Sequence, residues 1–202
     1  MSWYSTLSYI SASSNNSTDE QNRNDLGTPF FKLELMNGNF TRPAPSSTFV
    51  LGSSIPIRAE VELQTQKPML LFLKECIAAV AADLDRSSQV RPVITNAGCL
   101  VESKVGNSKF LPRRKPSEIR LSLQAFKFVF GENIFLHCKL AAWFASTFTV
   151  DKKACHYLME TERWELADDP IQSDLCSCCD TFCIQRDRGS LKLGILFGFQ
   201  TF

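Results

Sequence analysis

The chain has 202 residues, of which 44% are hydrophobic, and a formal net charge of +1 at pH 7. This length and hydrophobic fraction suit one domain of ordinary size with tails. The balanced charge provides no strong field, which argues against binding to nucleic acid or to an anionic lipid surface. The longest apolar runs, residues 77–82 and 194–199, are too short for a membrane-spanning helix, which needs about 20 residues.

The first 28 residues combine polar composition with glycosylation signals. Residues 11–28 are rich in Ser, Asn, Asp and Gln, so ordering them would cost backbone entropy without compensation. N-x-Ser/Thr acceptors at Asn15, Asn16 and Asn39 point to the secretory pathway, although Asn15 and Asn16 are too close for both to be glycosylated efficiently. We predict that residues 1–28 form a disordered, glycosylated linker.

The extreme N-terminus conflicts with secretion. Its first ten residues lack the basic segment and the unbroken apolar segment of a signal peptide. We reconcile the two observations by expecting that the chain is a fragment, or an incomplete gene model, whose true N-terminus is missing.

Alternating hydrophobicity predicts strands along the chain. In residues 31–35 and 55–63 the odd positions are apolar and the even positions mostly charged, which is typical of half-buried antiparallel strands, with Pro56 at a strand start or on an edge. Residues 69–79 are more uniformly apolar and fit a central strand, with a helix as the alternative. In residues 134–144 the even positions are apolar, so Cys138 is expected to point inward.

Between residues 119 and 130 the apolar phase slips by one position. Ile119, Leu121 and Leu123 are odd-numbered, whereas the apolar residues that follow are even-numbered Phe126, Phe128 and Phe130. A β-bulge near residue 125 would put both halves of one strand on the same core face. Because several such strands recur about every ten residues, with turn signals between them and no long amphipathic helix, the sequence predicts an all-β sandwich.

Eight cysteines include a dense cluster within residues 176–183. An even count suits a fully paired disulfide framework, and the alternatives are a zinc site or a redox centre. Cys76 and Cys138 both lie on apolar strand faces, so this pair could bridge two packed sheets as in immunoglobulin-like domains. Spacing alone does not settle the pairing. The zinc alternative would use the side chains of Cys155, His156, Cys176 and Cys179, whose spacing matches no standard zinc finger.

Other candidate residues have simpler interpretations. His137 and His156 are the only histidines and are better explained as solvent-facing residues than as a catalytic pair. No Gly-x-Ser-x-Gly motif supports a serine nucleophile. Residues 113–115 are basic and flanked by prolines, which favours a solvated loop over a polyanion site or a protease site. Trp143 and Trp164 are expected in the core.

Several motifs together resemble the C-terminal half of a zona pellucida domain. They are Phe126-Lys127-Phe128, residues 135–140, Lys153-Ala154-Cys155-His156-Tyr157, Trp164 and Cys176-Ser177-Cys178-Cys179 with Cys183. Segments 31–36, 97–102 and 108–113 also resemble this family, so the resemblance extends from about Phe30 to Cys183. It implies an immunoglobulin-like β-sandwich over residues 29–183 with a small disulfide-rich C-terminal lobe.

The resemblance also implies how the cysteines pair. The implied bridges are Cys76 to Cys138, Cys99 to Cys179, Cys155 to Cys176, and Cys178 to Cys183. The last three would hold a lobe that has little core of its own.

Residues 184–202 are interpreted as a tail with a hydrophobic patch. Leu191, Leu193, Ile195 and Phe197 alternate with other residues as in a strand, and leaving them in water would favour aggregation. The resemblance implies a plug that delays polymerisation, and a frayed terminus is the alternative. The family's N-terminal half, processing site and membrane anchor are not found in this sequence, where residues 186–188 are at most a degenerate processing site.

The function that the resemblance implies is structural. We expect a secreted glycoprotein of the egg coat, made from a membrane-anchored precursor, that assembles into extracellular filaments with other zona pellucida glycoproteins and offers surfaces to sperm. We expect no catalytic residue, cofactor or metal. The alternatives are a receptor or co-receptor ectodomain that binds a growth factor and a secreted hydrolase, for which the sequence shows no concave polar site.

Overall fold

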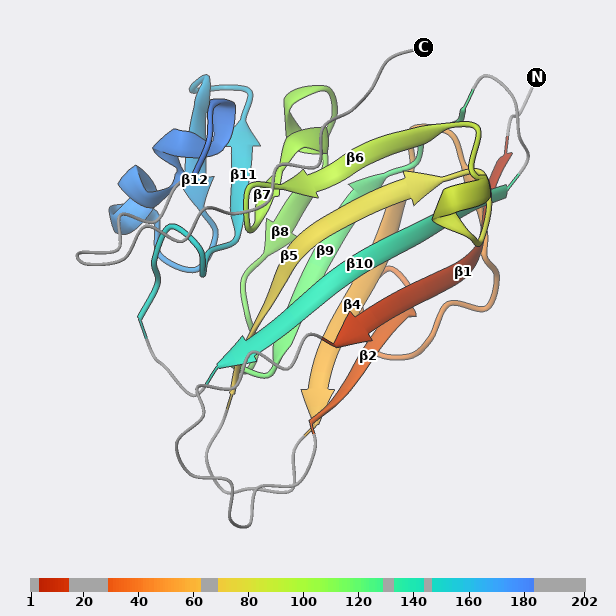
Figure 1. The fold of residues 1–202 in the computed structure, drawn as a ribbon, viewed down its shortest axis with the longest axis horizontal. Coiled ribbons are helices and arrows are strands. Elements are labelled where there is room, and N and C mark those ends of the chain that lie inside the picture. The colour runs from red at the N-terminus through yellow and green to blue at the C-terminus, as the bar shows by residue number, and fades with distance from the viewer. Residues whose placement is uncertain (1–3, 15–28, 63–68, 129–132, 144–146, 184–202) are drawn as a thin grey trace.

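The computed structural model describes residues 4–14 (backbone only), 29–62, 69–128, 133–143 and 147–183. Over these ranges the chain forms twelve strands and three 3₁₀ segments, and the strands make two packed sheets (Figure 1). The prediction of an all-β, immunoglobulin-like sandwich with several disulfides in its C-terminal region is confirmed.

Eight strands form the larger sheet, in the order β12-β11-β7-β6-β5-β10-β1-β3. They are β1 (Tyr4–Ser14), β3 (Thr48–Val50), β5 (Leu70–Ala79), β6 (Val90–Thr95), β7 (Cys99–Leu100), β10 (Asn133–Trp143), β11 (Cys155–Leu158) and β12 (Arg163–Leu166). The pairs β1–β10 and β7–β11 are parallel, and the other neighbours are antiparallel. Through the β7–β11 pair this sheet continues into the C-terminal part of the molecule.

Four strands form the smaller sheet, in the order β2-β4-β9-β8, and all pairs are antiparallel. They are β2 (Phe30–Leu35), β4 (Ser54–Glu62), β8 (Lys109–Leu111) and β9 (Glu118–Gln124). The 3₁₀ segments are η1 (Leu84–Arg86), η2 (Val101–Lys104) and η3 (Pro170–Asp180). In Figure 1 the four-stranded sheet lies behind β5, β6 and β10.

The predicted alternation sets the faces of the strands. In β4 the side chains of Ile55, Ile57, Ala59 and Val61 are at most 4% exposed, whereas Arg58 between them reaches solvent. Phe144 lies outside the described residues. The predicted strands at 69–79 and 134–144 are otherwise the adjacent strands β5 and β10, so the helix alternative for 69–79 is wrong. Its alanines are accommodated because β5 lies in the interior of the sheet, between β6 and β10.

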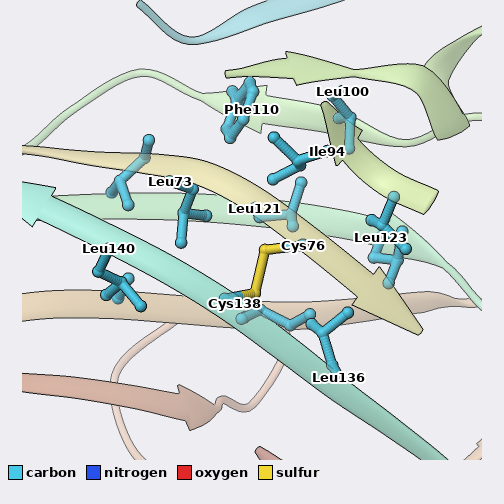
Figure 2. Close-up of a cluster of buried hydrophobic side chains, with 14 of the residues drawn as sticks. Leu73, Cys76, Ile94, Leu100, Phe110, Leu121, Leu123, Leu136, Cys138 and Leu140 are labelled. Carbon is cyan, nitrogen blue, oxygen red and sulfur yellow. A yellow bond between two sulfur atoms is a disulfide. The ribbon is translucent and has the colours of Figure 1, made fainter. Parts of the chain in front are cut away.

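The main core lies between the two sheets. Leu73 and Ile94 of the larger sheet and Leu121 and Leu123 of the smaller sheet gather around one interior space (Figure 2). Each of these four side chains is at most 1% exposed. Burying one of them fully is worth about 1.5–3 kcal/mol, so this core is the main source of the sandwich's stability.

The predicted bulge after β9 is wrong. Strand β9 ends at Gln124 with an unbroken register against β4, and residues 125–128 belong to no strand. Ala125 instead exchanges backbone hydrogen bonds with Gly52 and Ser53 in the turn before β4. The chain therefore leaves the sheet and still packs the partly buried Phe126 and Phe128 against the core, which explains the phase slip without a bulge in β9. Phe130 lies outside the described residues.

The prediction of a disordered linker over residues 1–28 does not hold for its first part. Residues 4–14 form β1, which pairs with β10 and, at its start, with β3. Without β1, the edge of β10 opposite β5 would be unpaired. The segment that covers it contains Tyr, Thr and Ile, which favour strands. Residues 15–28, with Asn15 and Asn16, lie outside the described residues.

Candidate functional site: the disulfide lobe

All eight cysteines are joined in disulfides. The four bridges are Cys76–Cys138, Cys99–Cys179, Cys155–Cys176 and Cys178–Cys183. These are the same four pairs that the family resemblance implies. Three of them lie in the C-terminal part of the molecule. We call this part the disulfide lobe: it consists of β11, β12 and η3, with the cysteines that attach it to β7, and Figure 1 shows β11 and β12 beside β7.

The Cys76–Cys138 bridge does not cross the sandwich. Cys76 of β5 and Cys138 of β10 are register partners in one sheet, with their Cα atoms 4.1 Å apart (Figure 2). The expectation of a bridge between two packed sheets is therefore wrong. Both side chains do point into the core, but alternation predicts only the face of a strand and not the strand that lies beside it.

A glycine allows the disulfide lobe to join the larger sheet. Gly98 has a φ of +117°, and a Cβ placed there would lie 2.0 Å from the carbonyl oxygen of Lys153. Its own carbonyl accepts a hydrogen bond from the amide of Cys155 at 2.8 Å. This close approach puts Cys99 and Cys155 side by side as parallel register partners. Each of them then reaches a different cysteine of η3.

The segment η3 is fixed at its start by capping. The carboxylate of Asp169 accepts a hydrogen bond from the amide of Ile171 at 3.1 Å, and Pro170 occupies the first turn, where its missing N–H costs nothing. The hydroxyl of Ser173 accepts from the amide of Leu166 at 3.1 Å, which ties η3 to β12. Cys176 and Cys179 are thereby buried against the sheet.

The core of the disulfide lobe is small and consists largely of sulfur. Its buried members are Cys99, Cys155, Trp164, Leu166, Cys176 and Cys179, so four of the six are disulfide cysteines. Trp164 stacks edge-on against Tyr157, with ring centroids 5.5 Å apart. Trp164 is buried as predicted. With so little apolar area, the lobe depends on its covalent bridges.

An ion pair holds the disulfide lobe against the sandwich. Arg113 Nε donates to the carboxylate of Asp168 at 2.6 Å, and both side chains are close to 10% exposed, at 11% and 7%. The guanidinium also donates to the carbonyls of Pro116 and Glu118 and lies 5.1 Å from the ring centroid of Phe72. The prediction of a solvated basic loop is therefore wrong for Arg113, because the sequence does not show that Asp168 comes to face it.

Lys153, part of a motif that resembles the family, is a buried cation. Its side chain is 0% exposed, and its Nζ lies 2.8 Å from Cys183 Sγ and 3.1 Å from Cys178 Sγ. Burial, and secondly Lys74, lower the pKa of Lys153 to about 8, whereas Asp151 raises it. A lysine directly before a buried Ala154-Cys155 pair was the sequence signal for this position, but spacing gave no reason to place it beside the C-terminal cysteines.

The two histidines occupy different environments. His156 is buried at 7% exposure, with Nε2 3.8 Å from a carboxylate oxygen of Glu165, so its predicted solvent-facing position is wrong. Burial is the main cause that lowers its pKa, Glu165 opposes this, and Lys109 adds to it. His137 lies on β10, where its Nε2 is 3.3 Å from the carbonyl oxygen of Ala81. The structure does not bring these two imidazoles to a common partner among the described residues.

The remaining predicted site residues are only partly described. Asn39 lies exposed in the turn between β2 and β3, and its side-chain oxygen accepts a hydrogen bond from the hydroxyl of Thr41 at 2.8 Å. The patch formed by Leu191, Leu193, Ile195 and Phe197 lies outside the described residues. The sulfur atoms of Cys99, Cys179 and Cys183 lie within 4.8 Å of one another, but each belongs to a disulfide and is not a free thiolate ligand.

Comparison with known proteins identifies relatives of this chain. Residues 26–156 match the family model of the zona pellucida ZP-C domain. The chain is 32% identical over 160 residues to zona pellucida sperm-binding protein 3 of Gallus gallus, an alignment that covers 75% of this chain and 35% of the relative. The proteins of the same name from Felis catus and Homo sapiens are 28% and 27% identical over 155 and 157 residues, each covering 74% of this chain and 36% of the relative.

The chain thus spans about a third of the length of these curated relatives. Among the described residues, none of the helical segments has the length and apolar character needed to cross a bilayer. The match extends from just before β2 into β11, and the fold and the four bridges are those that the resemblance implies. The chain belongs to the zona pellucida domain family, and residues 26–156 match its ZP-C domain.

Proposed function

We propose that this chain is part of a structural glycoprotein of the egg coat. The observation that carries the proposal is its similarity to zona pellucida sperm-binding protein 3 over 74–75% of the chain, in relatives from a bird and two mammals. Fully paired cysteines support an oxidising, extracellular location, because such disulfides do not persist in the cytosol. In this proposal the protein is secreted from a membrane-anchored precursor and acts by assembly rather than by catalysis.

The proposed partners are other zona pellucida glycoproteins and, through exposed surfaces, proteins of the sperm. The name of the relatives supports a role in sperm binding. The disulfides support a role as a building block of filaments, since one bridge closes 62 residues within the sandwich and another, over 80 residues, joins the sandwich to the disulfide lobe. In this layout residues 29–183 form the zona pellucida C-terminal module, to which β1 adds a strand, and a tail follows it.

The test is to locate the protein in tissue and to identify the proteins that it contacts there. Antibodies raised against residues 29–183 should stain the coat of ovarian eggs, and cross-linking there should couple the chain to other zona pellucida glycoproteins. Sperm should bind beads that carry the folded chain more than beads that carry the reduced, alkylated chain. Staining confined to somatic cell surfaces, with cross-linking to a growth factor, would instead support a receptor ectodomain and contradict the proposal.

We also propose that Asn39 carries an N-linked glycan. Its side chain is exposed in a turn, so a glycan there would meet no packed neighbour. Replacement of Asn39 by Gln should remove one step of the mobility shift that an N-glycosidase produces on the secreted chain, and Asn15→Gln with Asn16→Gln should together remove one more. An unchanged shift in Asn39→Gln would contradict glycosylation at this residue.

We further propose that residues 191–199 add a strand to the sandwich edge and delay polymerisation. The alternating apolar residues Leu191, Leu193, Ile195 and Phe197 support this role. Hydrogen exchange tests it, because docked backbone amides across 193–197 should exchange slowly. Exchange at the rate of an unstructured peptide throughout this segment would eliminate the proposal.

A further inference from the structure

The Cys178–Cys183 bridge differs from the other three in its surroundings. Both of its cysteines are partly exposed, whereas the other six cysteines are at most 6% exposed. Its cysteines are only 5 positions apart in sequence, against 21, 62 and 80 for the others. A short loop gains the least from closure, so opening this bridge releases the least chain entropy. An external thiol can therefore reach this bridge, and opening the bridge costs the protein little folding free energy.

The ammonium group of Lys153 lies directly on this bridge. Its Nζ is 2.8 Å from Cys183 Sγ and 3.1 Å from Cys178 Sγ, and its side chain is fully buried. A disulfide sulfur is a weak hydrogen-bond acceptor and carries no charge, so it compensates poorly for the desolvation of an ammonium. A thiolate at the same place would compensate much better. The buried cation is thus better matched to the reduced bridge than to the oxidised one.

We propose that Cys178–Cys183 is a thiol–disulfide exchange site and that Lys153 stabilises the thiolate that leaves when the bridge opens. The reaction partner is a dithiol, either a small molecule or a protein with a reactive cysteine pair. This activity is separate from the proposed role in the egg coat and does not depend on it.

The geometry also indicates which sulfur is attacked. Because Lys153 Nζ is closer to Cys183 Sγ, the better leaving group is Cys183, and the incoming thiolate attacks Cys178 Sγ. The Cys178–Cys183 bond breaks, its electron pair stays on Cys183 Sγ, and Cys178 forms a mixed disulfide. The second thiol of the partner then loses its proton, attacks its own sulfur in the mixed disulfide and releases Cys178. The partner is oxidised to a disulfide, and the bridge gains two electrons.

The first measurement is the order in which the bridges open. The secreted full chain is treated with limiting dithiothreitol at pH 7, alkylated at intervals and mapped by mass spectrometry. Cys178 and Cys183 should be labelled first. Lys153→Met should slow this labelling about tenfold, because without the neighbouring ammonium the Cys183 thiolate is a poorer leaving group. The matched control is Lys152→Met, whose ammonium lies 5.0 Å from the Trp143 ring centroid and should leave the rate unchanged.

A pH profile separates leaving-group stabilisation from a merely structural role. Burial lowers the pKa of Lys153 to about 8, and the charged groups that act on its ammonium are Lys74 of β5 and Asp151. The rate constant per thiolate should therefore fall as the pH rises from 7 to 9.5, in the wild type and also in Lys74→Met. In Lys153→Met it should be flat.

Three results would overturn the proposal: another bridge opens first, Lys153→Met opens as fast as the wild type, or the wild-type rate constant per thiolate does not change with pH. If Lys153→Met is not secreted, the order of labelling and the pH profile of the wild type decide the question on their own.

Discussion

Two buried polar residues show how the disulfide lobe is attached to the sandwich and what the attachment costs. Arg113 reaches the lobe through Asp168, and His156 sits in β11 at the junction with β7. Neither side chain is fully compensated, since Arg113 Nη2, Asp168 Oδ2 and His156 Nδ1 are buried without a hydrogen-bond partner. Such groups are sensitive to substitution and to pH, because loss of a partner or a change of charge leaves a buried polar group unpaired in an apolar environment.

Replacing Arg113 with Met should lower the free energy of unfolding by about 3–5 kcal/mol, because the buried carboxylate of Asp168 would lose its partner. Urea unfolding followed by tryptophan fluorescence would measure this change. The control Arg114→Met removes an exposed guanidinium that donates a 3.4 Å hydrogen bond to the carbonyl of Asn39, and it should change stability by less than about 0.5 kcal/mol. The double variant Arg113→Met with Asp168→Leu should recover much of the loss, and a double variant as unstable as the single one would contradict this account.

Stability should fall on mild acidification because of His156. Burial lowers its folded-state pKa below the unfolded value of 6.5, so the unfolded chain binds the proton more tightly. The stability that neutral His156 contributes is fully present above pH 6.5. It is lost as the pH falls from 6.5 through the lower folded-state pKa, and the free energy of unfolding then changes by at most about 1.4 kcal/mol per pH unit. The pKa of Lys153 is lowered from 10.5 to about 8, so its effect lies above this window. Unfolding of His156→Gln between pH 7.5 and 5 should show a smaller loss; an equal loss would assign the effect to another group.

At the scale of elements, turns and chain exits decide which strands meet. Strand β9 ends at Gln124, and the next residues leave the sheet before Phe126 and Phe128 return to the core, where their rings pack edge-on at 5.8 Å. The tight connection before β7 instead brings two strands together, β7 and β11. There Asn96, Ala97 and Gly98 all adopt positive φ values, which turns the chain sharply and exposes the Gly98 carbonyl to β11.

Replacing Gly98 with Ala should damage the disulfide lobe selectively. The added Cβ would lie 2.0 Å from the carbonyl oxygen of Lys153, and the φ of +117° is strained for any residue with a side chain. We expect a loss of at least about 3 kcal/mol, or failure of secretion. The matched control is Gly38→Ala, since no atom lies within 4 Å of a Cβ built at Gly38. If Gly98→Ala were secreted with wild-type stability and all four bridges intact, the close approach of β7 and β11 would not matter for the fold.

For the molecule as a whole, disulfide bridges supply the stability that apolar burial does not. The sandwich has a large apolar core between two sheets, whereas the buried core of the disulfide lobe is mostly cystine. The bridge between Cys99 and Cys179 connects the two parts over 80 residues of sequence. The sandwich is therefore expected to fold by burial, and the lobe by burial that becomes sufficient only after its bridges form.

Removing bridges one at a time should reveal this division. In the chain-entropy model, Cys155→Ser with Cys176→Ser should cost about 3 kcal/mol and Cys178→Ser with Cys183→Ser about 2 kcal/mol, because the closed loops span 21 and 5 residues. Cys76→Ser with Cys138→Ser should cost about 4 kcal/mol, and this loss should lower the stability of the sandwich without unfolding it. Thermal unfolding of the secreted variants, together with near-ultraviolet circular dichroism of Trp164 in the lobe, measures both effects. A lobe that keeps its tryptophan signal without any of its three bridges would show that its own core suffices.

The sequence by itself determined the all-β class, the inward faces of β4 and β10, and the family, because alternation and cysteine spacing are local properties that do not depend on how the strands are arranged. It did not determine which strands are neighbours. Cys76 and Cys138 were correctly placed facing inward, yet their bridge joins adjacent strands instead of two sheets. Arg113 with Asp168, and Lys153 with Cys183, are 55 and 30 residues apart in sequence. Only the tertiary structure brings such pairs together, because their contact depends on the register and topology of the whole sheet, and no local pattern encodes these.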